Sequence, residues 1–256
     1  MRDECTAHYE RLASSYDDIW SHSPEFIDWM TTETLNRLDL RPDDRVVDIG
    51  GGTGLLSRRL VESAQLTEPI LCVDPSQAML DRIPENPMII RVRASMEELA
   101  DGLVELPYRQ FDVLVLKEVV HHAADPSAIL AGLAGILRPG GRILVITLPP
   151  RLDYPLFSAA LDRFAQMQPD PHQLGNALAA KGLRTEVSSA EFKQVYSAAR
   201  YTDRIRGRCM SVLSTFSDDE IEQGIEEIRA AYPHDRLEFV DRFMFVRGEL
   251  PLNHRT

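Results

Sequence analysis

The stretch VVDIGGGTGLL, residues 46–56, limits the fold of this chain more than any other part of the sequence. Residues 46–49 predict a short buried strand, and the glycines that follow predict a turn in which bare backbone faces a ligand. The dinucleotide-binding pattern G-x-G-x-x-G does not fit, because Leu55 stands three residues after Gly52. The turn therefore predicts a ligand site at the end of this strand, but not a nicotinamide dinucleotide site.

Further strand-like runs begin at residues 69, 88, 111 and 142, and stretches with helical periodicity lie between them. In the stretch from 125, Asp125 is a suitable N-cap and Pro126 suits the first helical position. Strands that are apolar throughout and alternate with helices are typical of a parallel sheet covered on both faces. We therefore expect an α/β fold with a Rossmann-like, doubly wound sheet.

Beyond residue 150 the alternation is less regular. Helices are predicted at 154–166, 171–182, 197–216 and 217–233, and two more strands at 183–196 and 236–248. The prediction is then a seven-stranded sheet, mostly parallel with an antiparallel last strand, plus a helical cap. Because ligands of such sheets bind at the carboxyl ends of the strands, we expect cap segments 1–40, 148–171 and 196–233 to cover the pocket. All of them belong to a single domain, residues 1–256.

Charge and cysteine content exclude several classes of partner. A formal net charge of −12 argues against nucleic acid, since proteins that bind it usually present a basic patch. Cys5, Cys72 and Cys209 lack the spacing of a disulfide framework or a zinc site. No apolar run reaches the length of a membrane span, and no signal peptide opens the chain. We expect a cytoplasmic protein without a membrane or nucleic-acid partner, and the sequence neither requires nor excludes a homodimer.

Five stretches carry a family resemblance through their order and spacing: YERLASSYD, VVDIGGGTG, CVDPSQAML, FDVLVLKEVVHHAADP and LRPGGRILVI. Residues 9–150 resemble class I S-adenosylmethionine-dependent methyltransferases of the small-molecule group (methyltransferase type 11) that includes the ubiquinone-biosynthesis type. The resemblance implies S-adenosylmethionine as cofactor, S-adenosylhomocysteine as its product, and in-line transfer of a methyl group to N, O or C of a small metabolite. Residues beyond 150 resemble the family only in outline, which suits a part that recognises the acceptor.

The resemblance assigns most cofactor contacts to the ends of the first two strands. Asp48 is expected to orient the loop and the amino group of methionine, with a helix cap as the alternative role. Asp74 is expected to accept hydrogen bonds from both ribose hydroxyls. The residues expected to surround the cofactor with them are Gly50, Gly51, Gly52, Gly54, Pro75, Ser76 and Met79. Core packing is the alternative for Met79.

Two further segments expected to contact the cofactor follow the third and fourth predicted strands. Many relatives have an aspartate where Ser95 stands, to accept a hydrogen bond from the adenine amino group. The Ser95 hydroxyl can accept one too but is neutral, so Ser95 and the backbone around Met96 are both candidates for the adenine contact. Lys117 and Glu118 leave the fourth strand where the strand order reverses, and one of them is expected to line the methionine side of the pocket.

Two histidines and two tyrosines are the candidates for catalysis. In some relatives a histidine in this loop and an N-terminal tyrosine form an acid/base pair, and imidazole has a pKa suited to proton transfer near neutral pH. His122 holds the family position, His121 precedes it, and Tyr16 and Tyr9 stand near the start of the chain. Loop structure and aromatic packing are the alternatives for these residues.

Arg200, Arg204 and Arg208 repeat every four residues in the helix predicted at 197–216. The functional interpretation is a clamp for a carboxylate or phosphate of the acceptor. The alternative is a solvated face whose arginines pair with nearby acids.

Other functions stay open at this stage. A protein of this fold can bind S-adenosylmethionine without methylating, as a cyclase or a binding protein. An NAD-dependent oxidoreductase conflicts with the glycine pattern, an RNA methyltransferase with the acidic charge, and an arsenic methyltransferase with the scattered cysteines. Metal-binding carboxylates of the catechol-methylating kind do not stand out, so we predict a metal-independent enzyme. The identity of the acceptor is beyond what the sequence reveals.

Overall fold

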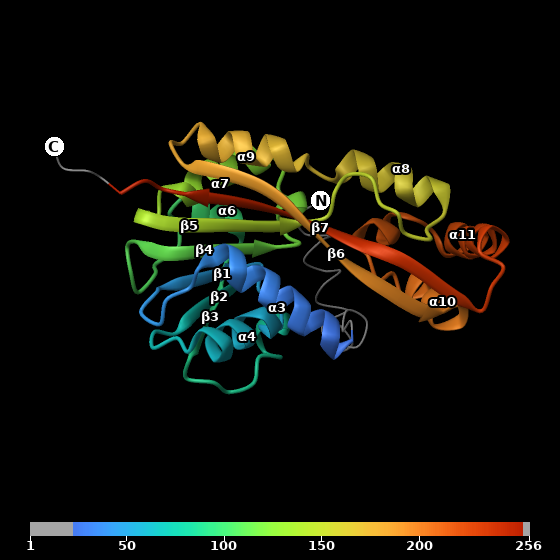
Figure 1. The fold of residues 1–256 in the computed structure, drawn as a ribbon, viewed down its shortest axis with the longest axis horizontal. Coiled ribbons are helices and arrows are strands. Elements are labelled where there is room, and N and C mark those ends of the chain that lie inside the picture. The colour runs from blue at the N-terminus through green and yellow to red at the C-terminus, as the bar shows by residue number, and fades with distance from the viewer. Residues whose placement is uncertain (1–22, 253–256) are drawn as a thin grey trace.

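A computed structural model describes residues 23–252, and a seven-stranded sheet with the order β3-β2-β1-β4-β5-β7-β6 runs through it (Figure 1). The strands are β1 (Val46–Ile49), β2 (Ile70–Asp74), β3 (Ile89–Arg93), β4 (Phe111–Lys117), β5 (Leu137–Thr147), β6 (Arg184–Ser197) and β7 (Arg236–Glu249). Among these described strands only β7 runs against the others, antiparallel to both β5 and β6. The doubly wound, mostly parallel sheet with an antiparallel last strand is confirmed.

Helices cover both faces of the sheet. They are α3 (Pro24–Leu38), α4 (Leu55–Ala64), α5 (Gln77–Leu80), α6 (Met96–Ala100), α7 (Pro126–Ala134), α8 (Ser158–Met167), α9 (Pro171–Ala179), α10 (Ala198–Arg206) and α11 (Asp218–Ala231). Two short 3₁₀ helices are η1 (Val120–His122) and η2 (Ser211–Thr215). Figure 1 shows α6, α7 and α9 on one face and α3 and α4 on the other. No helix within residues 23–252 is long and apolar enough to cross a membrane.

Alternate residues of the strands supply the two cores. Val113 and Val115 of β4 point to the side of α3 and α4, whereas Leu114 and Leu116 point to the side of α7 and α9. All four side chains are fully buried. Because successive side chains of a strand face opposite ways, a strand buried on both faces is apolar throughout, which is the pattern that predicted a parallel sheet.

The order of strands reverses between β1 and β4, which both pair with parallel neighbours. β1 is followed by β2 and β3 on one side, and β4 is followed by β5 on the other. The carboxyl ends of β1 and β4 therefore diverge into loops that leave in opposite directions, and this is where open α/β sheets bind ligands.

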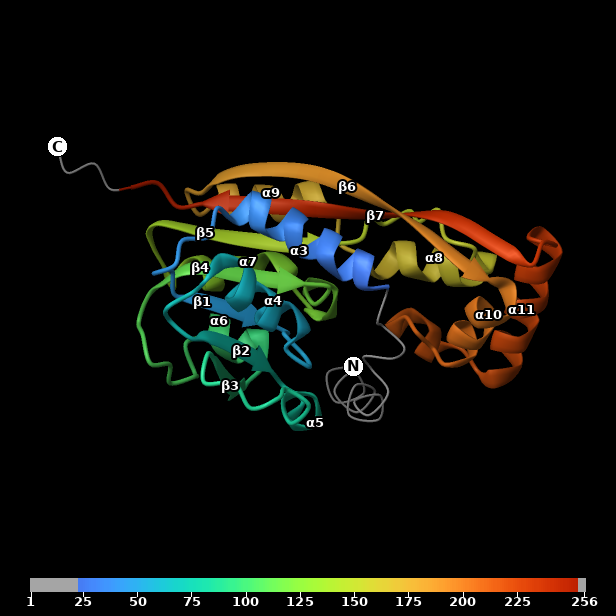
Figure 2. The same ribbon diagram turned by 60° about the horizontal axis from the view of Figure 1, so that its bottom comes forward.

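The strands β6 and β7 extend past the rest of the sheet into a lobe beside its carboxyl edge. β7 pairs with β5 only through residues 244–249 but with β6 along its whole length, 236–249. The far part of this strand pair packs against α10, which packs against α11, and α8 packs against η2 (Figures 1 and 2). The expected cap segments 148–171 and 196–233 supply these helices. The described part of segment 1–40, α3, packs against α4, β5 and β6.

The prediction of one helix over 197–216 is wrong for its second half. α10 ends at Arg206, and Arg208 adopts a left-handed backbone conformation with φ 54° before η2 begins. Gly207 is the C-cap residue of α10, and because glycine has a low helix propensity it favours the end of the helix there. Arg208 consequently does not continue a stripe with Arg200 and Arg204.

Candidate functional site

The glycine loop between β1 and α4 has one closed and one open side. A Cβ atom on Gly50 would lie 2.5 Å from Cγ2 of Val119, so this glycine lets the loop pack against the segment that follows β4. Gly52 has φ +56°, and a Cβ there would meet no atom of the described residues within 4 Å. The backbone at Gly52 is therefore open to a ligand, as the sequence predicts for this turn.

Asp74, at the end of β2, lies against this loop. Its Oδ2 accepts a hydrogen bond from the Gly52 N–H at 3.0 Å, and its Oδ1 accepts one from the Ser76 N–H at 2.9 Å. Burial raises the pKa of Asp74 to about 6 although both hydrogen bonds act in the opposite direction. A carboxylate that is nearly buried and tied to the open glycine is well placed to accept further hydrogen bonds from a ligand on that loop.

Asp48 holds the inner side of the same loop. The carboxylate is buried, and its Oδ2 accepts a hydrogen bond from Oγ of Ser57 in α4 at 2.6 Å. Burial raises its pKa to about 6, against the effect of this bond and of the Lys117 charge. Asp48 thus connects β1 to α4, and its contact with a ligand stays a prediction.

The next predicted segments begin short helices at the same edge. Ser76 caps α5 by accepting a hydrogen bond from the Met79 N–H at 3.3 Å, and Met79 is buried. Ser95 forms a reciprocal capping box with Glu98 at the start of α6, directly before the buried Met96. Capping fixes the two turns in place. Whether these residues and the intervening Pro75 contact adenine stays a prediction.

A pocket opens at the carboxyl end of β4, between the sheet and the lobe. Its polar lining comes from five segments and includes Lys117, Glu118, Tyr154, Gln194, Tyr196, Tyr201, Arg204 and Asp241. Lys117, Glu118 and Arg204 were predicted site residues. Segments far apart in the sequence meet here because β7 pairs with β5, the neighbour of β4, and extends past the end of that pairing.

Glu118 is the most unusual residue of this pocket. It has a positive φ of 53°, a conformation that costs a non-glycine residue free energy and recurs at functional sites. The residue is partly exposed, but its Oε1 atom is buried and has no hydrogen-bond partner among the described residues. Burial raises the pKa of Glu118 to about 7, although the Lys117 charge and a hydrogen bond from the Leu148 backbone act to lower it.

Asp241 and Tyr154 face Glu118 across the pocket. The Tyr154 hydroxyl donates a hydrogen bond to Oδ1 of Asp241, and Nε2 of Gln194 donates one to Oδ2 at 3.2 Å. Burial raises the pKa of Asp241 and raises that of Tyr154 well above its ordinary value. The sequence analysis missed both residues. The available signal was an aspartate on the strand face that otherwise carries Leu237, Phe239, Phe243 and Phe245.

The candidates for catalysis, two histidines and two tyrosines, are not among the described residues that line the pocket. His121 and His122 lie in η1 with ring centres 4.0 Å apart, and neither ring is among the described residues that line the pocket. Burial lowers the pKa of His121 well below its ordinary value, so this ring is neutral at physiological pH. Tyr9 and Tyr16 lie outside the described residues.

Of the three arginines, the structure brings Arg204 to the pocket, where its guanidinium carbon lies 5.2 Å from the centre of the Tyr196 ring. Arg208 pairs with Asp218 instead, at 2.6 Å, and Arg200 is exposed. Within residues 23–252, no three His, Cys, Asp or Glu side chains are arranged to share a metal ion. Metal independence stays a prediction.

Comparisons with known proteins bear on this arrangement. A family model described as a methyltransferase domain matches residues 47–143. The chain is 31% identical over 173 residues to a ubiquinone biosynthesis O-methyltransferase of Xylella fastidiosa strain 9a5c, which covers 62% of this chain and 69% of that protein. It spans only 42% of the protein of the same name from strain M23.

Solved structures that share the fold include two methyltransferases. A putative methyltransferase from an antibiotic biosynthesis pathway of Anabaena variabilis superposes with a TM-score of 0.64 at 18% identity, over 85% of this chain and 96% of that one. A phosphoethanolamine N-methyltransferase of Haemonchus contortus, in complex with S-adenosyl-L-methionine, gives 0.60 at 16% identity, over 94% of this chain and 57% of that one.

Proposed function

Since this chain belongs to the class I S-adenosylmethionine-dependent methyltransferases, we propose that it moves a methyl group from S-adenosylmethionine to a small molecule held in the pocket at the end of β4. The observation that carries the proposal is the pairing of an open glycine backbone at Gly52 with the buried carboxylate of Asp74. A neutral adenosine needs close approach to backbone and an acceptor for its hydroxyls, and these two residues offer both.

The residues present fit such a cofactor. Asp74 would hold the ribose hydroxyls, with Gly50, Gly51, Gly52 and Gly54 beneath the ligand. Asp48 and Lys117 would face the methionine end, since the Lys117 charge acts on Asp48. Pro75, Ser76, Met79, Ser95 and Met96 would surround the adenine. When bound, the cofactor supplies a methyl group already activated on a sulfonium.

The protein then has to bring two molecules together and keep water out. Val119 packs against Gly50 on the loop, and the preceding Glu118 lines the pocket, so one short segment forms a wall of both sites. Holding the reacting atoms in contact and in line contributes a large part of the rate acceleration of such a transfer. The name of the Xylella relative favours an oxygen acceptor, with N and C as the alternatives.

The histidines are secondary candidates for proton transfer in this proposal. Neither His121 nor His122 is among the described residues that line the pocket, so neither ring faces the proposed acceptor there. A role for Tyr16 or Tyr9 stays open, because both lie outside the described residues.

Isothermal titration calorimetry with S-adenosylhomocysteine tests the cofactor site. The protein should bind this compound and not NAD, and Asp74→Asn should weaken binding about 10- to 100-fold, as the loss of charge-assisted hydrogen bonds predicts. Asp43→Asn is the matched control, because Asp43 is exposed at the opposite end of the sheet. Equal binding by both variants would contradict the assignment of Asp74.

A screen of candidate acceptors with isotope-labelled S-adenosylmethionine, read by mass spectrometry, tests the transfer itself. Transfer to a small molecule would support the proposal. Binding of the cofactor without transfer to any compound would favour the alternative, a protein that uses this fold to bind S-adenosylmethionine without methylating.

A further inference from the structure

Glu118 lies between the glycine loop and the acceptor pocket. We propose that its Oε1 atom takes up the proton that an acceptor hydroxyl loses on methylation, and that the pocket selects flat, ring-bearing molecules with a neutral hydroxyl. This inference rests on the proposed function and adds to it a proton acceptor and a substrate class.

The position of Glu118 follows from its neighbours in the chain. Val119 packs on Gly50, where an added Cβ would come within 2.5 Å of it, so the next residue touches the cofactor loop. Glu118 itself lines the pocket together with Tyr154 and Asp241. A carboxylate at this point lies next to the cofactor loop and within the pocket of the acceptor, whose proton a general base has to reach.

Backbone hydrogen bonds fix the position of Glu118. Its N–H donates to the carbonyl oxygen of Ile146 at 2.8 Å, which fixes the left-handed conformation, φ 53°. The backbone of Leu148 donates to the carboxyl group, and Oε1 is left buried without a partner among the described residues. A buried acceptor atom without a donor is costly unless a ligand supplies the hydrogen bond.

The other acids and bases that face Glu118 are less suited to this role. Asp241 of β7 already receives hydrogen bonds on both oxygens, from Tyr154 and Gln194. Tyr154 has its proton engaged by Asp241, and Lys117 has no free electron pair while it is protonated. Tyr196, Tyr201 and Cys209 also line the pocket, and burial raises the pKa of each, so these groups keep their protons near neutral pH. Among the described ionisable groups of the pocket, Glu118 is the carboxylate with an oxygen that has no hydrogen-bond partner.

Charge and shape favour a neutral, flat acceptor. Lys117 and Arg204 balance Glu118 and Asp241 in formal charge, so the pocket has no net attraction for a cation. Its walls include aromatic rings, of which Tyr196 and Phe239 are stacked with centres 6.0 Å apart and an interplanar angle of 14°. Aromatic rings arranged in this way stack well with another ring.

The proposed step balances atoms and charge. The acceptor oxygen forms a bond to the methyl carbon while the bond from that carbon to sulfur breaks, and sulfur keeps the electron pair. The hydroxyl proton moves to Oε1 of Glu118 and leaves later to water. The products are a methyl ether, S-adenosylhomocysteine and a neutral Glu118 carboxyl.

The test compares Glu118→Gln with the wild type on a panel of defined probes. Catechol, resorcinol and 2-naphthol represent ring hydroxyls, and benzylamine and 2-phenylethylamine represent ring-bearing cations. The wild type should methylate a hydroxyl probe, and kcat should rise with pH through about 7 as Glu118 ionises. In Glu118→Gln, kcat should fall about 100-fold or more and lose this pH dependence, while the affinity for S-adenosylhomocysteine stays within about twofold.

Controls separate this inference from the proposed function. Glu62→Gln, on the exposed face of α4, should leave kcat and the pH profile unchanged. Infrared difference spectra of the wild type against Glu118→Gln should show a carboxyl band that titrates near pH 7, without any substrate.

Each unfavourable result has a distinct meaning. Failure of the wild type to bind S-adenosylhomocysteine would contradict the proposed function. If binding is intact, unchanged kcat in Glu118→Gln, or weakened cofactor binding as its main effect, would overturn the role of Glu118. Methylation of the amines alone, or of no hydroxyl probe, would overturn the substrate class.

Discussion

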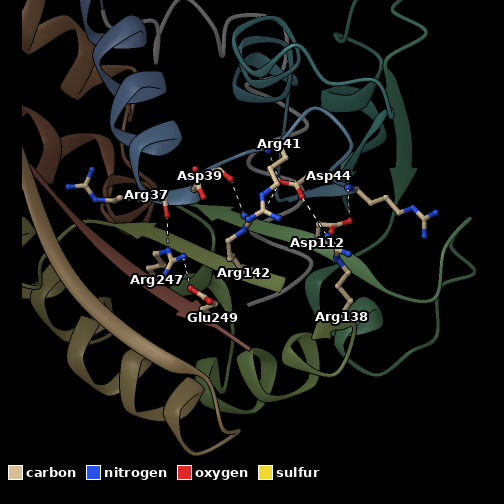
Figure 3. Close-up of polar contacts among 10 residues, drawn as sticks. Arg37, Asp39, Arg41, Asp44, Asp112, Arg138, Arg142, Arg247 and Glu249 are labelled. Atoms are coloured by element: carbon tan, nitrogen blue, oxygen red, sulfur yellow. Dashed lines mark hydrogen bonds and ion pairs between the residues drawn. The ribbon is translucent and has the colours of Figure 1, made fainter. Parts of the chain in front are cut away.

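Buried carboxylates at the two ends of the sheet differ in whether arginine side chains pair with them. At the amino end Asp44 and Asp112 are held by arginines: Arg142 and Arg138 contact Asp44, and Arg138 also contacts Asp112 (Figure 3). At the carboxyl end Asp48, Asp74 and Glu118 have no such ion pair within the described residues, and burial raises their pKa values to about 6, 6 and 7. In the first arrangement each buried charge is compensated, and removing one partner would destabilise the fold.

The second arrangement costs stability and is understandable only as a site. A buried carboxylate that has hydrogen-bond donors but no contact with an opposite charge is poorly compensated, and such groups cluster at sites that bind ligands or transfer protons. One of these three acids, Glu118, also has a positive φ. The comparison therefore assigns folding stability to the amino end and function to the carboxyl end.

The largest expected effect is at the amino end. Arg142→Met should lower the free energy of unfolding by about 3–5 kcal/mol, because the buried Asp44 loses its closest cation and keeps, among the described residues, only Arg138, at 4.0 Å, and the Arg41 N–H. Urea unfolding at pH 7 measures this. Arg184→Met, which breaks an exposed pair with Glu249, is the matched control and should change it by about 1 kcal/mol or less. Equal losses in the two variants would remove the contrast between the ends.

At the carboxyl end, removing a buried charge should increase the free energy of unfolding instead of lowering it. The folded-state pKa of Glu118 lies above its ordinary value, so the native state binds this proton more tightly and loses stability as pH rises from about 4.5 to 7. Glu118→Gln removes that loss and should raise the free energy of unfolding by about 1–3 kcal/mol at pH 8 and by almost nothing at pH 4. Urea unfolding at both pH values, with Glu62→Gln as control, measures the difference. A variant that is less stable than wild type at pH 8 would contradict the account.

The smallest effect on stability should come from the glycine loop. Gly52→Ala forces a positive φ on alanine but meets no neighbouring atom, so it should cost about 1–2 kcal/mol. Gly102→Ala is matched, since Gly102 has φ +70° and equally open surroundings. Thermal unfolding should give similar losses, whereas calorimetry should show weakened S-adenosylhomocysteine binding in Gly52→Ala alone. Equal binding by the two variants would place the ligand elsewhere.

The sequence predicts well those features that depend on local order. The strand and turn at 46–54, the cap at Asp125 and the alternation of strands and helices follow from periodicity and backbone preference, and the structure confirms them. Asp74 ends β2 as expected and lies against Gly52. These residues are close in sequence to the elements that position them.

The pocket depends on long-range pairing and was only partly predictable. Tyr154 and Asp241 stand 87 residues apart and meet because β7 pairs with β5 and extends past it. Nothing local fixes that register. Arg208 was assigned to a helix because helical spacing was extended through Gly207, where the backbone in fact turns.

A crystal structure of the protein with S-adenosylhomocysteine tests the central claim most directly. The account predicts ribose hydroxyls on Asp74, backbone contact at Gly52, and a sulfur atom that faces the pocket lined by Glu118. A ligand bound outside the glycine loop, or a sulfur atom that points away from Glu118, would contradict it.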